Sequence, residues 1–146
     1  MKETKELLLL SELRDNCGKI GFDPETAVRE LKELIEGLKV IDYYITIEVP
    51  SEHFVGTLMD SLVLTDKIML GYEVKSGNIS LVHRFPLNRV ALMTEEIIEE
   101  KGEKYIIAHF YWGSLGSLGT SAMLGNRERL RKFIIRASKY IFEGEQ

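Results

Sequence analysis

The first part of the chain shows apolar residues at helical spacing. Leucines recur three or four positions apart in residues 3–16, which predicts an amphipathic helix that Gly18 and Gly21 end. Asp23 and Pro24 then supply an N-cap and a proline in the first turn of a second helix. The apolar face of that second helix consists of Ala27, Val28, Leu31, Leu34, Ile35 and Leu38.

From Val40 onward the pattern changes to a period of two. Apolar residues alternate with polar ones up to Val49, which predicts a half-buried strand that Pro50 ends. Further short apolar segments lie between turn-forming residues and predict strands at 56–64, 68–75, 79–85, 90–97 and 105–112. Strands joined by such short turns pair antiparallel, because a parallel crossover needs about a dozen residues.

The last third of the chain contains an acidic segment, a Gly/Ser-rich segment and a final helix. Residues 95–104 hold five glutamates and are expected to form an acidic connection. The segment Gly113–Gly125, GSLGSLGTSAMLG, predicts a flexible loop, with a short strand near 120–124 as an alternative for its end. Asn126 caps a final helix. Its predicted buried stripe consists of Leu130, Phe133, Ile134, Ala137 and Ile141.

This order of elements predicts an α+β fold. Two extra N-terminal helices, residues 1–39, are expected to pack on an antiparallel β-barrel of six or seven strands, residues 40–146. The sheet is expected to curl because closure removes exposed edge strands. The C-terminal helix is expected to cap one open end of the barrel.

Composition narrows the classes of function. The 146 residues suffice for one hydrophobic core, and the net charge of −4 argues against a dedicated nucleic-acid binder. No segment is long and apolar enough to span a membrane, and the acidic N-terminal segment does not fit a secretion signal. The single cysteine, Cys17, cannot form an internal disulfide, which fits a reducing compartment. We therefore expect a cytoplasmic protein.

Two segments carry a resemblance to a known family. Residues 62–67, LVLTDK, are similar to a strand end of bacterial pleckstrin-homology-like (PH-like) domains, and residues 85–90, FPLNRV, are similar to a later turn of that family. Ile68 stands where the family often has an arginine. The resemblance implies a seven-stranded, two-sheet barrel closed by a C-terminal helix, extending from about residue 40 to residue 141.

The resemblance does not extend to a lipid head-group site. In the better-known eukaryotic relatives, lysines and arginines of the loop after the first strand bind phosphoinositide head groups. The corresponding residues 50–55, PSEHFV, include no lysine or arginine and one glutamate. A carboxylate in this loop repels a phosphate.

Residue patterns for catalysis and metal binding are not seen in the sequence. The histidines His53, His83 and His109 are far apart and lack a paired-ligand motif, so no metal site is predicted. The Gly113–Gly125 segment lacks the Lys-Ser/Thr of a phosphate-binding P-loop, although anion binding by its backbone amides is an alternative. No serine has the glycine pattern of a nucleophile elbow. We predict no catalytic residue and no cofactor.

The favoured hypothesis is a non-enzymatic protein-binding or self-assembly module. Its partner is a protein, and another copy of the chain is one candidate. The Gly113–Gly125 segment would dock on that partner through Leu115, Leu118 and Met123.

Two alternatives remain. A small-molecule-binding protein or enzyme would have its site at the barrel mouth, where the candidate residues are Arg84, His109, Tyr111 and Trp112. An anionic-surface binder, for membrane or nucleic acid, would use the final helix, because residues 127–139 hold six cations against one glutamate, a net charge of +5. Its candidate contacts are Arg127, Arg131 and Lys139.

Overall fold

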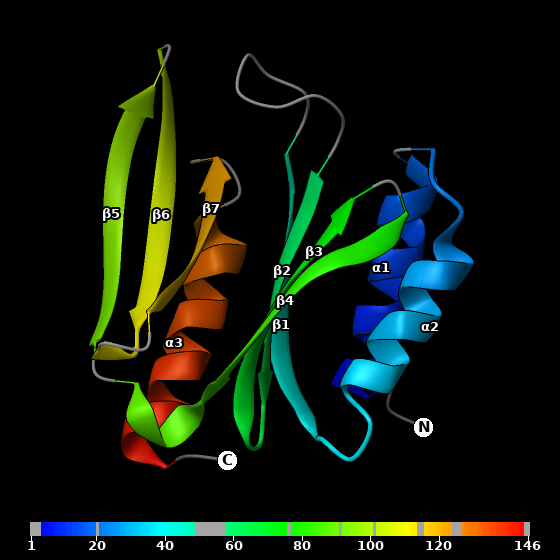
Figure 1. The fold of residues 1–146 in the computed structure, drawn as a ribbon. Helices are drawn as coiled ribbons and strands as arrows, with labels where there is room; N and C mark the ends of the chain where they lie inside the picture. Colours follow the sequence, from blue (N-terminus) through cyan, green and yellow to red (C-terminus); the bar gives the residue numbers. More distant parts are fainter. Residues whose placement is uncertain are drawn as a thin grey trace. The chain divides into compact units, whose positions relative to one another are not determined.

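The computed structural model has an α+β fold that divides into two compact units, Met1–Arg84 and Phe85–Gln146. It describes residues 4–19, 21–48, 58–75, 77–90, 92–100, 102–113, 116–123 and 127–144. The elements of both units are drawn in Figure 1.

The first unit contains two helices and a four-stranded sheet. The helices are α1 (Lys5–Lys19) and α2 (Pro24–Leu34). The strands are β1 (Val40–Glu48), β2 (Leu58–Thr65), β3 (Ile68–Lys75) and β4 (Asn78–Pro86), in the spatial order β1-β2-β3-β4. Strand β2 pairs antiparallel with both β1 and β3, as the short turns predict. The last two residues of β4 belong to the second unit.

Helices α1 and α2 lie on one face of this sheet (Figure 1). The core beneath them combines the helical leucines with alternate residues of the strands, so the period of 3.6 and the period of two meet in one cluster. Its fully buried members include Leu9, Leu13, Leu31, Val63 and Leu70.

The first helix ends later than predicted, because Gly18 lies inside α1. Its end is formed by Gly21, which has a φ of 83°. The amide of Phe22 donates to the carbonyl of Cys17 over 2.8 Å, and the amide of Gly21 donates to the carbonyl of Gly18 over 3.2 Å. These two bonds are those of a Schellman motif, in which a glycine with positive φ is favoured.

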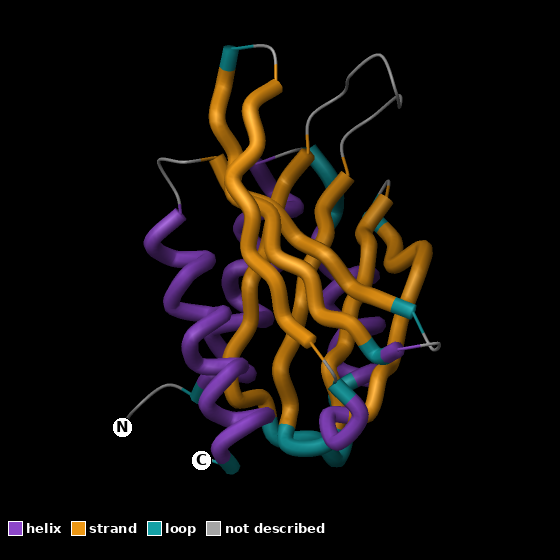
Figure 2. Tube along the Cα trace, turned by 90° about the vertical axis from the view of Figure 1, so that its left-hand side faces the viewer, coloured by secondary structure: helices purple, strands orange, loops and turns teal. Residues whose placement is uncertain are grey.

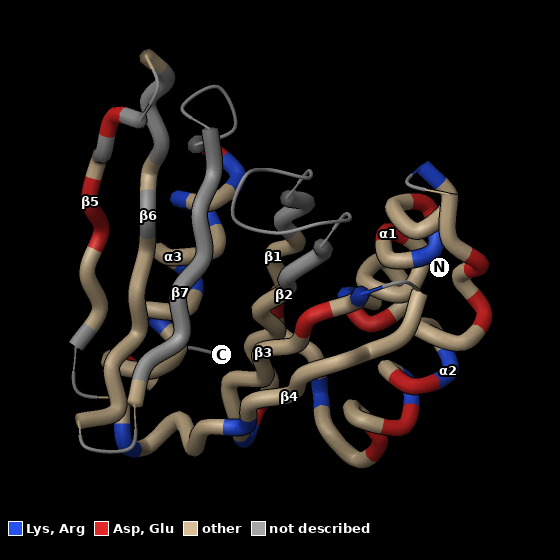
Figure 3. Tube along the Cα trace, turned by 45° about the horizontal axis from the view of Figure 1, so that its top comes forward, with Lys and Arg blue, Asp and Glu red and all other residues tan. Residues whose placement is uncertain are grey.

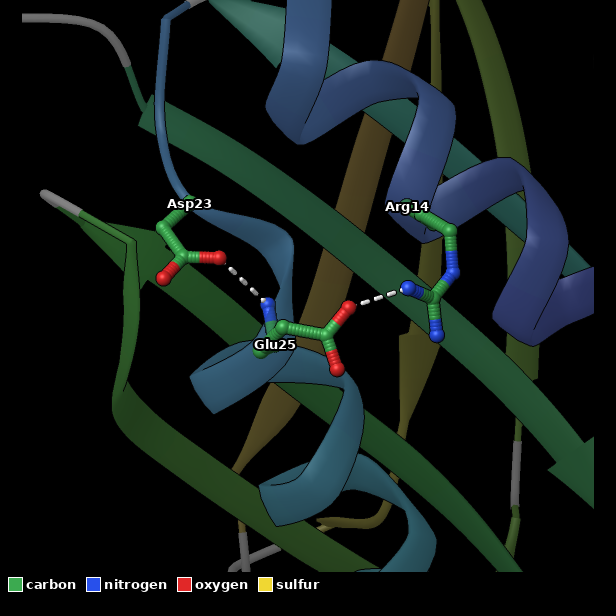
Figure 4. A network of polar contacts seen from close by, with 3 residues as sticks. All are labelled: Arg14, Asp23 and Glu25. Carbon is green, nitrogen blue, oxygen red and sulfur yellow. Dashed lines mark hydrogen bonds and ion pairs between the residues drawn. The ribbon is translucent and has the colours of Figure 1, made fainter.

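The start of α2 is capped as predicted. An Asp23 carboxylate oxygen accepts a hydrogen bond from the amide of Glu25 over 3.1 Å. Glu25 in turn forms an ion pair with Arg14 of α1, so one residue connects the cap to the neighbouring helix (Figure 4). The cap therefore sets the start of α2, and an exposed ion pair links that start to α1.

The turn between β2 and β3 is built on Thr65, which is fully buried. Its hydroxyl donates to the carbonyl of Ile68 over 2.8 Å and accepts from the amides of Lys67 and Ile68 over 3.2 and 2.9 Å. The neighbouring Asp66 pairs with Lys39: its carboxylate accepts from the Lys39 amide over 2.9 Å, and its amide donates to the Lys39 carbonyl over 3.0 Å. The Thr-Asp-Lys segment thus closes the hairpin and holds the start of β1.

The second unit contains a short 3-10 helix, a three-stranded sheet and a long helix. These are η1 (Leu87–Arg89), β5 (Leu92–Glu100), β6 (Glu103–Tyr111), β7 (Ser117–Met123) and α3 (Arg127–Glu143). The strands have the spatial order β5-β6-β7, and both pairs are antiparallel. Helix α3 contacts β6 and β7. Figure 2 shows the strands of both sheets and the turns that join them.

The predicted acidic connection at 95–104 is wrong, because these residues form the end of β5 and the start of β6. Register pairs continue to Glu99 with Lys104 and Glu100 with Glu103. The turn is confined to the tip of the β5–β6 hairpin, where Gly102 has a φ of 81°. The β-branched Ile97 and its cross-strand partner Ile106 stabilise a strand that charge alone disfavours.

The predicted flexible loop at Gly113–Gly125 is also wrong for most of its length. Residues 117–123 form β7, which pairs with β6 from Ser117 opposite Tyr111 to Met123 opposite Tyr105. The alternative of a short terminal strand was closer, but it placed the start of the strand three residues too late. A tight turn precedes β7, in which the Trp112 amide donates to the Gly116 carbonyl over 2.9 Å. Positive φ at Gly113 and Gly116 explains the glycines.

Candidate protein-binding surface beside helix α3

Helix α3 packs on its sheet through the predicted apolar stripe. Leu130, Phe133 and Ala137 are buried, whereas Ile134 and Ile141 are half-buried. The rings of Phe133 and Phe110 meet edge to face, with centroids 6.3 Å apart and an interplanar angle of 81°. The central contacts of the helix are therefore those expected from its sequence.

A second set of apolar residues lies outside that stripe. Ile135 is 54% exposed and Phe142 is 50% exposed. Arg131, Ile135 and Phe142 are spaced i, i+4 and i+11, which places them on one flank of the helix. Two large apolar side chains thus remain at the surface of α3 beside a cation.

The ion pair between Arg131 and Glu95 shows which way this flank points. The Arg131 Nε donates to a Glu95 carboxylate oxygen over 2.9 Å, so the flank lies on the side of α3 toward β5. Glu95 and Ile97 share one face of β5 by alternation. Their register partners Ala108 and Ile106 are buried, which identifies this as the face that α3 covers.

Ile97 is nevertheless 53% exposed, because α3 contacts β6 and β7 more extensively than the outer strand β5. We use the name α3–β5 surface for Ile97, Ile135 and Phe142 together with the Arg131–Glu95 pair. Exposed apolar side chains beside charged residues occur at sites where another molecule binds, and here they are spread along α3 and β5. Sequence reasoning missed this surface, although Ile135 and Phe142 already deviate from the 130-133-137 stripe.

The charges on α3 are only partly neutralised within the chain. Lys132 forms an i, i+4 ion pair with Glu128 over 3.4 Å, and both side chains are highly exposed. Of the three predicted anion contacts, Arg131 is engaged with Glu95, Lys139 is exposed, and the side chain of Arg127 is outside the described part. Figure 3 shows basic residues along α3 and acidic residues along β5. The surface therefore carries both signs of charge.

The three residues predicted to dock on a partner are placed only at the level of the backbone. Leu118 and Met123 lie in β7, opposite Phe110 and Tyr105 in the register. Leu115 lies outside the described residues. Because 117–123 is a strand, a contact through Leu118 or Met123 would be made from a sheet and not from a free loop.

The predicted pocket residues are distributed over both units. Arg84 is the last residue of the first unit and is exposed, whereas His109, Tyr111 and Trp112 belong to the second unit. The rings of His109 and Tyr111 lie 5.8 Å apart on one face of β6. Trp112 is buried: it stacks on Phe85 with centroids 4.4 Å apart, and its indole N–H donates to the Pro86 carbonyl over 2.7 Å. Trp112 is a core residue of its unit.

The core of the first unit contains buried polar groups at Cys17, Ser61 and Tyr72. Burial raises the pKa of the Cys17 thiol, and the Asp23 carboxylate raises it further, so little reactive thiolate forms at neutral pH. Burial also raises the pKa of the Tyr72 hydroxyl. The side chain of the cross-strand neighbour Ser61 lowers the Tyr72 pKa and so offsets part of this rise. The two hydroxyls do not form a hydrogen bond with each other. The Cys17 thiol and the Tyr72 hydroxyl therefore stay protonated at neutral pH.

The described residues contain neither a cluster of metal ligands nor a helix able to cross a membrane. No three His, Cys, Asp or Glu side chains of that part of the chain lie close enough to share a metal ion. No helix in the same ranges has the length and apolar character needed to cross a membrane.

A scan against protein-family models and searches of curated proteins and of solved structures give no match to this chain.

Proposed function

We propose that the protein is a non-enzymatic protein-binding module of the cytoplasm with a PH-like fold. The order of elements supports the fold, since sheets of four and three antiparallel strands followed by a long C-terminal helix are what the resemblance implies. The segment LVLTDK supports it too, because its Thr65 and Asp66 close a hairpin and hold the first strand.

The observation that carries the function is the α3–β5 surface. It exposes about half of each of three large apolar side chains, Ile97, Ile135 and Phe142, beside an ion pair. Interfaces between proteins combine an apolar centre with charged residues of both signs at the rim. An anionic membrane or nucleic acid would instead meet the carboxylates of β5, which repel phosphate.

The test is binding by the full-length chain and by two matched variants. Ile135→Ser with Phe142→Ser removes the apolar part of the surface, and Leu7→Ser with Leu81→Ser removes exposed apolar side chains elsewhere. Partners captured from cells and then purified should bind the second variant like the wild type and the first at least roughly tenfold more weakly.

Equal loss of binding in both variants would contradict the proposal, and so would no loss in either. Vesicles of anionic lipid and a generic RNA, each at two salt concentrations, serve as competing ligands. Salt-sensitive binding to either, independent of Ile135 and Phe142, would favour an anionic-surface binder instead.

A further inference from the structure

We infer that the partner is an acidic amphipathic helix of another protein, which lies along the outer face of α3. This inference rests on the proposed protein-binding function and names the chemistry of the partner. The outer face is a pattern that repeats after seven residues, formed by Lys132 and Ile135 and then by Lys139 and Phe142. All four side chains are exposed.

The two lysines of the outer face lie on one side of its apolar residues. Each lysine precedes its apolar neighbour by three positions, which places it about 60° round the helix at about 100° per residue. Arg131 precedes Ile135 by four positions and lies about 40° to the other side, where it pairs with Glu95 of β5. Ile135 and Phe142 therefore form a line between that ion pair and the two lysines.

The repeat of seven residues favours a helix as the partner. Two helices that cross at a small angle meet again after about two turns, so their contacts recur every seven residues. Ile135 and Phe142 lie about 10.5 Å apart along the axis, at about 1.5 Å per residue. A partner helix presents apolar residues at the same interval. An extended strand presents same-side residues at about 6.8 or 13.6 Å, which does not match both positions.

The charge of α3 favours an acidic partner over a second copy of the chain. The helix holds six cations and two glutamates, a net charge of +4. Two such helices laid side by side would repel each other. Carboxylates that flank the apolar residues of a partner helix would instead face Lys132 and Lys139, and such charge pairs beside an apolar seam set the choice of partner.

Glu128 favours a helix over an anionic membrane. It lies seven residues before Ile135, at the same position of the repeat, and its side chain is highly exposed. A flat anionic surface that contacts Ile135 and Phe142 would also meet this carboxylate, which repels phosphate. A partner helix avoids the repulsion by ending before Glu128 or by placing a cation opposite it.

The probe is a synthetic peptide of about three heptads, with leucine at positions a and d and glutamate at positions e and g. A second peptide has the same composition with its leucines moved out of the heptad pattern, and so it controls for charge alone. Fluorescence anisotropy of each labelled peptide is measured against the full-length chain. The wild type should bind the first peptide at least about tenfold more tightly than the second.

Two pairs of substitutions separate the outer face from the net charge of the chain. Lys132→Glu with Lys139→Glu should weaken binding of the first peptide about tenfold or more. Lys19→Glu with Lys75→Glu changes the net charge equally at exposed positions of the first unit and should leave binding unchanged. The milder pair Lys132→Gln and Lys139→Gln should act in the same direction, and it decides the test if circular dichroism shows that the charge-reversed chain is unfolded.

Equal binding of the two peptides overturns the inference, and so does an equal effect of the two pairs of glutamate substitutions. Self-association of the wild type that Ile135→Ser with Phe142→Ser abolishes also overturns it, because the surface would then bind a second copy. Binding to anionic vesicles without binding to the first peptide overturns it as well. A purified partner that needs Ile135 and Phe142 but neither lysine would still support the proposed function, so the two proposals fail separately.

Discussion

Replacing Thr65 with valine tests whether the β2–β3 turn depends on one hydroxyl. The valine keeps the shape and the β-branched Cβ and removes the oxygen that makes three hydrogen bonds, two with Ile68 and one with Lys67. A hydroxyl offers one donor and two acceptor positions, so all of its capacity is used here. Thr65 is fully buried, and water does not replace it without rearrangement of the turn.

The expected loss follows from these bonds. Each contributes about 0.5–1.5 kcal/mol net, and a buried partner left without a hydrogen bond costs about 1–3 kcal/mol. Lys67 is exposed, so water satisfies its amide in the variant, whereas both backbone groups of Ile68 are partly buried. We expect Thr65→Val to lower the free energy of unfolding of the first unit by about 2–3 kcal/mol. This equals about a 30- to 150-fold change in the opening equilibrium.

The assay is native-state hydrogen exchange of the backbone amides of β2 and β3, because the two compact units need not unfold together. The amides of Ile68 and Leu70 report on the hairpin, and those of β6 in the second unit serve as an internal reference. Protection in β2 and β3 should fall by the predicted factor.

Thr65→Ser is the matched control. It keeps the hydroxyl and loses one methyl group, which costs about 1 kcal/mol. The serine variant should therefore be more stable than the valine variant. If valine changes protection by less than about 0.5 kcal/mol, or is less harmful than serine, the hydroxyl does not stabilise the turn as argued.

Three further predictions concern the first unit. Asp23→Ala removes the α2 cap that the Glu25 amide uses and should cost about 1 kcal/mol in urea unfolding, while Asp23→Asn should restore most of it. Burial raises the pKa of Tyr72 above its ordinary 10.0, so the stability that the neutral hydroxyl contributes is complete below about pH 10 and is lost as the pH rises further. Tyr72→Phe should be less sensitive to alkali in the same pH series, and equal curves would contradict this. Cys17 should resist a thiol reagent in the folded protein at neutral pH and react at once in denaturant, and rapid labelling of the folded chain would show that it is not buried.

The elements with one clear period were predictable from the sequence. The alternation after Val40 gives β1, and the Asp23-Pro24 signal gives the start of α2, because in both cases local pattern and packing agree. The end of α1 was misplaced because Gly18 and Gly21 look alike in sequence. Only the hydrogen bonds of the following Phe22 decide which glycine takes positive φ.

The end of β5 and the start of β7 were predicted wrongly for a different reason. The segment EEIIEE gives each face of β5 the pattern Glu-Ile-Glu, so neither face looks buried. Glu99 opposite Lys104, with a glycine between them, is nevertheless a signal for a hairpin. In β7 the glycines and serines have low strand propensity, and pairing with β6 overrides it. The α3–β5 surface depends on which part of a sheet a helix leaves uncovered, and that is a property of packing that no linear pattern contains.

The stacking of Trp112 on Phe85 has a practical consequence for spectroscopy. Trp112 is the only tryptophan of the chain and lies wholly within the second unit, where Pro86 accepts its indole proton. Fluorescence excited selectively in the indole therefore reports on the environment of the second unit alone. A denaturation curve followed by this emission, compared with one followed by far-ultraviolet ellipticity, separates the melting of the two halves without any attached dye.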